Sequence, residues 1–167
     1  MPGLEDLYRE IILDHYRSPR NRGELATPPA VRVEGFNPLC GDEVVVYVNV
    51  SDDGKISDVA IDGQGCSISQ SSASMMSAAV KGKTLAEVSD LTQTFKAMMS
   101  IHETNIGGIA DEPMEPVEGV NLGDLEALRG VVKFPTRIKC ATLGWNTLAE
   151  AIVDATTEEA AATTEET

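Results

Sequence analysis

The hydrophobic period of the chain changes at Gly63, and this change decides the class of fold. Before Gly63, three segments alternate apolar and polar residues as strands do: VRVEGF (31–36), EVVVYVNV (43–50) and ISDVAID (56–62). The turn SDDGK (51–55) joins the last two, which predicts an antiparallel hairpin with a third strand before it. After Gly63 the apolar residues recur at helical spacing. Strands followed by helices predict an α+β fold.

Helical patterns precede and follow these strands. The first begins at Leu4 and stops before Pro19. Two later helices begin with the spacing of a capping box, in which two residues satisfy each other's free backbone N–H groups; the pairs are Ser67 with Gln70 and Thr84 with Glu87. The segment LEALRGV (125–131) predicts a short helix. The last helix starts at Pro135 and carries the apolar stripe Ile138, Ala141, Trp145, Leu148 and Ile152.

Two segments lack helical or strand periodicity. Residues 101–123 collect glycine and proline among acids, so we predict an insertion loop long enough to suspect a function. The final segment TTEEAAATTEET (156–167) has nothing to bury, and we predict that it is a disordered acidic tail. Residues 1–155 are then one domain, which suits a chain of 167 residues with 42% hydrophobic content.

The charge of the chain limits its partners. With 13 Lys+Arg and 27 Asp+Glu, the net charge of −14 argues against nucleic acid or an anionic membrane surface as the main partner. No apolar run reaches the length of a membrane span, and acids stand where a signal peptide needs basic residues. We therefore expect a cytoplasmic protein with free thiols, and a monomer, because no heptad or long bare edge demands self-association.

The three cysteines stand at the ends of predicted elements. Cys40 precedes a strand, Cys66 lies in the glycine turn before a helix, and Cys140 follows Pro135. Free backbone N–H groups at a helix start favour a thiolate, so Cys66 and Cys140 suit metal ligands or nucleophiles. Together with Cys40 and Asp42, these two cysteines make a four-donor set that Zn²⁺ accepts in a tetrahedron. Gly41 can let the backbone turn so that Cys40 and Asp42 reach one point.

Other interpretations of these residues remain open. The spacing contains no Cys-x-x-Cys pair, so scattered buried cysteines compete with a metal site, and an iron–sulfur cluster is the other soft-ligand choice. The segment GQGCSIS lacks the third glycine of a dinucleotide fingerprint, which argues against a dinucleotide-binding site. His15 lies on an apolar helix face and is expected to be packed, and His102 falls in the predicted insertion. Arg137 and Lys139 add positive charge beside Cys140.

Four motifs together resemble one family. ILDHYRSPRNRG (12–23), NPLCGDEV (37–44), DGQGCSISQSSASMM (62–76) and FPTRIKCATLGW (134–145) are similar, in this order, to SufU-type proteins, relatives of the IscU and NifU iron–sulfur scaffolds. The similarity covers about Leu4 to Ile152. It implies an IscU-like α+β fold, a three-stranded antiparallel sheet packed by helices. It also implies that Cys40, Asp42, Cys66 and Cys140 bind zinc.

The resemblance further implies a function in sulfur transfer. A SufU-type protein takes persulfide sulfur from a pyridoxal-phosphate cysteine desulfurase of the SufS type and relays it towards an iron–sulfur assembly scaffold. Cys40 is the implied acceptor, released when a histidine of the desulfurase enters the zinc shell. Its predicted position on a loop beside a glycine agrees with this role.

The alternative is an iron–sulfur assembly scaffold that binds a nascent cluster on its three cysteines. Scaffold relatives carry a histidine immediately before the last cysteine, where this chain has Lys139. The segment 101–123 resembles the insertion that separates SufU-type members from scaffolds. Both departures favour sulfur transfer over cluster assembly.

Overall fold

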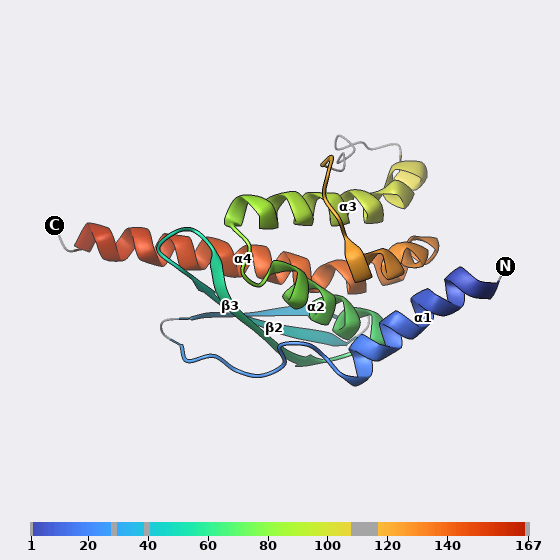
Figure 1. The fold of residues 1–167 in the computed structure, drawn as a ribbon, viewed down its shortest axis with the longest axis horizontal. Coiled ribbons are helices and arrows are strands. Elements are labelled where there is room, and N and C mark those ends of the chain that lie inside the picture. The colour runs from blue at the N-terminus through green and yellow to red at the C-terminus, as the bar shows by residue number, and fades with distance from the viewer. Residues whose placement is uncertain (1, 28–29, 39–40, 108–116, 166–167) are drawn as a thin grey trace.

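The computed structural model describes residues 2–27, 30–38, 41–107 and 117–165. Its elements are ordered along the chain as α1 (Pro2–Arg17), β1 (Val31–Asn37), β2 (Asp42–Val50), β3 (Ile56–Gln64), α2 (Ser67–Val80), α3 (Leu85–Gly107), the 3-10 helix η1 (Gly123–Lys133) and α4 (Pro135–Glu165) (Figure 1). The three predicted strands and the change to helices after Gly63 are confirmed. None of the described helices is long and apolar enough to cross a membrane.

The sheet is an antiparallel meander in the order β1-β2-β3. Val46 of the central strand lies opposite Val33 on one side and Ile61 on the other. The alternation in β2 sends Val44, Val46 and Val48 to one face, where all three are fully buried. Figure 1 shows α2 and α4 along the sheet, with α3 on the far side of α4. This arrangement confirms the predicted α+β fold.

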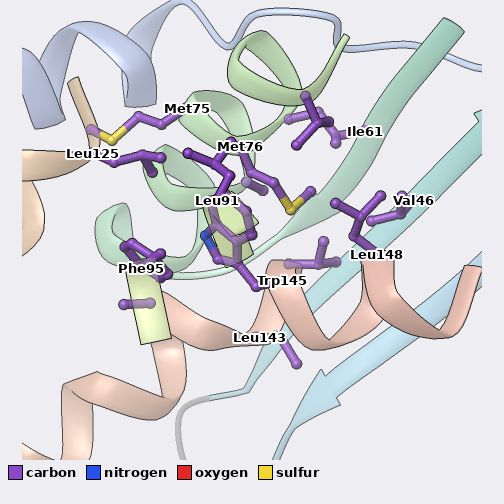
Figure 2. Close-up of a cluster of buried hydrophobic side chains, with 14 of the residues drawn as sticks. Val46, Ile61, Met75, Met76, Leu91, Phe95, Leu125, Leu143, Trp145 and Leu148 are labelled. Atoms are coloured by element: carbon purple, nitrogen blue, oxygen red, sulfur yellow. The ribbon is translucent and has the colours of Figure 1, made fainter. Parts of the chain in front are cut away.

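Trp145 of α4 lies at the centre of the core. Its ring stacks on Phe95 of α3 with the ring centroids 4.9 Å apart, and Figure 2 shows Met76 and Leu91 beside it. Met98 and Met99 are also buried, so the apolar residues of α3 pack in the core, as predicted. The remaining face of the sheet carries a smaller cluster of Val45, Tyr47 and Ala60, packed with Leu25.

His15 is a packed residue, as predicted. His15 is 2% exposed. Its ring bridges two other elements. Nδ1 lies 2.8 Å from the hydroxyl oxygen of Ser74 in α2, and Nε2 lies 2.9 Å from Oδ2 of Asp124 in η1. The Ser74 oxygen also accepts the backbone N–H of Arg20 at 2.8 Å. This network ties α1 to α2 and to η1.

Two helices are longer than the sequence predicted. The helix α3 continues to Gly107, so residues 101–107 are not part of a loop. Residues 108–116 of the predicted insertion lie outside the described residues, as does the side chain of His102. The helix α4 continues to Glu165, where we predicted a disordered tail from residue 156. Alanine and glutamate have high helix propensity, and adding residues to an existing helix avoids the cost of nucleation.

Candidate metal centre

Asp42 opens β2 directly after the turn from β1. It pairs with Asn37 at the end of the β1–β2 ladder and is only 1% exposed. Gly41 precedes it with φ +67°, a left-handed conformation that glycine adopts without strain. The turn predicted at Gly41 is therefore present, and it directs the Asp42 carboxylate toward the start of α2. There Oδ1 accepts the backbone N–H of Cys66 at 2.9 Å.

Cys66 is the N-cap of α2. Its sulfur accepts the backbone N–H of Ser69 at 3.4 Å and lies 3.8 Å from Oδ2 of Asp42. The capping box predicted between Ser67 and Gln70 is therefore wrong, and the Gln70 side chain instead donates to the backbone carbonyl of Glu43 at 3.3 Å. Cysteine is not among the usual N-cap residues, so the preference for serine placed the predicted cap one residue late.

Cys140 lies one turn inside α4 and is fully buried. Its sulfur is 3.5 Å from Nδ2 of Asn37, which donates to it. Gly144, one turn further on, faces α2, and a Cβ there would lie 3.4 Å from Cα of Ala73. The absence of a side chain at Gly144 therefore permits the close approach of α2 and α4 beside Cys140.

The structure brings together three of the four predicted donors. One ligand atom from each of Asp42, Cys66 and Cys140 lies within 4.8 Å of the other two. Cys40, the fourth, lies outside the described residues. Because the donors come from β2, α2 and α4, three distant parts of the chain meet at one point.

The electrostatics of this cluster favour an anionic carboxylate. Burial would raise the pKa of Asp42, but hydrogen bonds from the Cys140 thiol and from the backbone N–H and thiol of Cys66 outweigh it. The pKa of Asp42 therefore lies below its ordinary value of 3.8. A carboxylate that stays ionised beside two thiols is a ready ligand for a cation.

The donor set fits a zinc ion. Two sulfurs and one oxygen are ligand types that zinc accepts, and a fourth donor completes its usual tetrahedron. Ligand atoms of a tetrahedral zinc–thiolate site are about 3.8 Å apart. A small contraction of the observed cluster would reach that separation.

Sequence reasoning missed two residues that shape this centre. Gly65 makes room for the carboxylate, because a Cβ there would lie 2.5 Å from Oδ1 of Asp42. Asn37 is 5% exposed and holds the Cys140 sulfur. Both stand inside the motifs that the sequence singled out, NPLCGDEV and GQGC, but neither is a metal-ligating residue type. Arg137 and Lys139 are exposed.

Known proteins are similar to this chain in sequence and in fold. Residues 7–141 match the family described as NifU-like N terminal domain. The chain is 40% identical over 149 residues to the zinc-dependent sulfurtransferase SufU of Bacillus subtilis, covering 89% of this chain and 91% of that relative. It is 41% identical over 149 residues to the iron–sulfur cluster assembly scaffold protein IscU of Streptococcus pyogenes, covering 89% of this chain and 84% of the relative.

Solved structures agree with the fold. The crystal structure of a putative iron–sulfur cluster assembly scaffold protein for the SUF system from Fervidobacterium islandicum matches with a TM-score of 0.71 and 34% identity. That match covers 88% of this chain and 97% of the other. The resemblance predicted from four motifs is thereby confirmed over most of the sequence. From its sequence and its three-stranded sheet packed by helices, the chain belongs to the family of NifU-like N-terminal domains.

Proposed function

We propose that the protein serves iron–sulfur cluster assembly as a zinc-dependent sulfurtransferase. It would accept persulfide sulfur from a pyridoxal-phosphate cysteine desulfurase and pass it towards an assembly scaffold. The observation that carries this proposal is the convergence of Asp42, Cys66 and Cys140 from three elements. The similarity to a relative named as a zinc-dependent sulfurtransferase supports it.

Asp42, Cys66 and Cys140, with Cys40, are the residues that would hold the zinc. Zinc bound there would keep the thiols deprotonated. The chain orients its donors through its own hydrogen bonds: the Cys66 N–H holds the Asp42 carboxylate and Asn37 holds the Cys140 sulfur. These contacts reduce the rearrangement that metal binding requires.

Cys40 is our proposed sulfur acceptor. Its thiolate attacks the terminal sulfur of the desulfurase persulfide, a new S–S bond forms on Cys40, and the desulfurase cysteine leaves as a thiolate. Cys140 is unsuited to this step, because its full burial prevents a partner from reaching it. The assignment of Cys40 itself rests on the family resemblance.

A cluster-assembly scaffold is the second candidate. The IscU relatives support it, and two cysteine sulfurs of this chain already converge. Lys139 argues against it, because the position before the last cysteine then lacks the extra imidazole donor that the resemblance associates with scaffolds.

The experiment follows labelled sulfur. The desulfurase of the same organism is charged with ³⁵S-cysteine and mixed with the protein, and the label on the protein is measured under non-reducing conditions. We expect label on the wild type and none on Cys40→Ser, while Ser51→Ala, a change in the β2–β3 turn, should accept sulfur as the wild type does. Equal labelling of Cys40→Ser would contradict the acceptor assignment.

Metal analysis separates the two candidate functions. About one zinc per chain in protein purified without added metal is expected for the sulfurtransferase. A stable coloured cluster after anaerobic reconstitution, with no transfer of label, would favour the scaffold.

A further inference from the structure

A groove of ≈ 830 Å³ opens beside the candidate metal centre. Its walls come from α1, from η1 and from the first residues of α2 and α4. Most of the surface is apolar, with Tyr8, Ile12, Ile68 and Val131 among its lining residues. Cys66 also lines it, so anything seated in the groove lies against a proposed metal ligand.

The charge of this groove is opposite to that of the chain. Of the residues whose side chains the structure describes, Arg9, Lys133 and Arg137 line it and no acidic residue does. The whole chain has about two acids for each base, 27 against 13. A groove whose described lining carries three basic side chains is, in such a chain, an electrostatic target for an acidic segment, and the acidic surface elsewhere repels that segment.

Phe134 supplies an exposed apolar anchor at the groove. Its side chain lines the groove and is 61% exposed, directly after Lys133 at the end of η1. Among the described residues only Phe36 is an aromatic residue of equal exposure. An exposed aromatic beside a cation is typical of the residues that contribute most to protein interfaces.

We propose that this groove is the docking site for a segment of the desulfurase that carries an apolar side chain flanked by carboxylates. The inference rests on the proposed function, because it takes the desulfurase as the partner. The apolar side chain lies on the groove wall, and the carboxylates lie near the basic side chains Arg9 and Lys133. Docking then brings the partner to Cys66 and to the proposed metal centre.

Calorimetric titration of the desulfurase into the zinc-loaded protein tests the docking site. Arg9→Glu and Lys133→Glu should each raise Kd about tenfold or more, because reversal replaces attraction with like-charge repulsion. Arg129→Glu is the matched control: Arg129 lies on the same helix η1, is exposed, and is not part of the groove. It should leave Kd within about twofold of the wild type.

The apolar part of the groove has its own pair of variants. Phe134→Ala should raise Kd about fivefold or more. Val153→Ala removes a side chain of similar exposure, 60%, from α4 outside the groove and should change little. Because these side chains are exposed, each variant should fold as the wild type does. An unchanged thermal unfolding curve verifies this.

The outcomes separate this inference from the proposed function. Equal binding of Lys133→Glu and Arg129→Glu, with sulfur still transferred by the wild type, overturns the groove and leaves the function standing. Groove-dependent binding without sulfur transfer supports the groove and overturns the sulfurtransferase. No binding of the desulfurase by the wild type overturns both.

Discussion

Gly65 leaves the space that the Asp42 carboxylate occupies. A Cβ at residue 65 would lie 2.5 Å from Oδ1 of Asp42 and 2.8 Å from the Ser69 hydroxyl oxygen. We therefore expect Gly65→Ala to displace the carboxylate and to weaken zinc binding about tenfold or more. Competition with a chromogenic chelator measures the affinity.

The control for this variant is Gly130→Ala. A Cβ on Gly130 meets nothing within 4 Å, and this glycine does not need a positive φ. Zinc affinity should stay at the wild-type value in Gly130→Ala. If Gly65→Ala binds zinc as tightly as the wild type, the carboxylate is not held where the structure places it.

At the scale of single residues, the candidate donors could be proposed from the sequence, whereas their surroundings could not. Asp42, Cys66 and Cys140 could be selected by chemical type and by their positions at element ends. Gly65 and Asn37 contribute space and one hydrogen bond, and both contributions exist only once β2, α2 and α4 have packed together. The spacing of residues along the sequence does not indicate such contacts.

The N-terminus of α3 contains a reciprocal pair that was predicted from its spacing and is confirmed. The Thr84 backbone N–H donates to Oε1 of Glu87 at 3.2 Å, and the Glu87 N–H donates to the Thr84 hydroxyl oxygen at 3.1 Å. These bonds, first of all the one from the Thr84 backbone, lower the pKa of Glu87 below 4.5. Because the folded-state pKa is depressed, this stabilisation is present above pH 4.5 and is lost as pH falls through the folded-state pKa.

We expect Glu87→Ala to lower the free energy of unfolding at neutral pH, because the Thr84 backbone N–H then loses its carboxylate acceptor. The loss should be smaller at about pH 3, where the protonated Glu87 already bonds weakly to the backbone of residue 84. Urea unfolding at the two pH values measures it. Thr92→Ala in the same helix loses only a hydrogen bond to the Val88 carbonyl, so its effect should not depend on pH. A pH-independent loss in Glu87→Ala would refute the role of the Glu87 carboxylate.

At the scale of elements, the period of the apolar residues identified the strands and helices but not all of their ends. Helix α2 begins one residue earlier than its serine pattern predicted, since the Cys66 sulfur replaces a hydroxyl as the cap. The helices α3 and α4 continue beyond the last residues whose apolar period could be recognised in the sequence, and this period alone cannot locate the end of a helix.

The proposed zinc would join the sheet to two helices. Structural zinc in small domains contributes on the order of 10 kcal/mol to folding, since the unfolded chain has no preformed site. We expect a chelator to lower the unfolding temperature of the zinc-loaded protein markedly, as followed by circular dichroism.

A variant without a complete donor set is the control for chelation. Cys140→Ser should unfold at a lower temperature than the wild type and should respond little to the chelator. An unfolding temperature of the wild type that is the same with and without zinc would show that the ion does not cross-link the fold.

The order of the donors along the chain determines when the site can form during synthesis. Asp42 and Cys66 leave the ribosome with the sheet and the start of α2, whereas Cys140 belongs to α4, the last element. A nascent chain without α4 therefore lacks the buried sulfur and would hold the proposed zinc less tightly than the finished domain. The proposed zinc would therefore be acquired only after α4 has been synthesised, and a chain truncated before α4 would lack one of its proposed ligands.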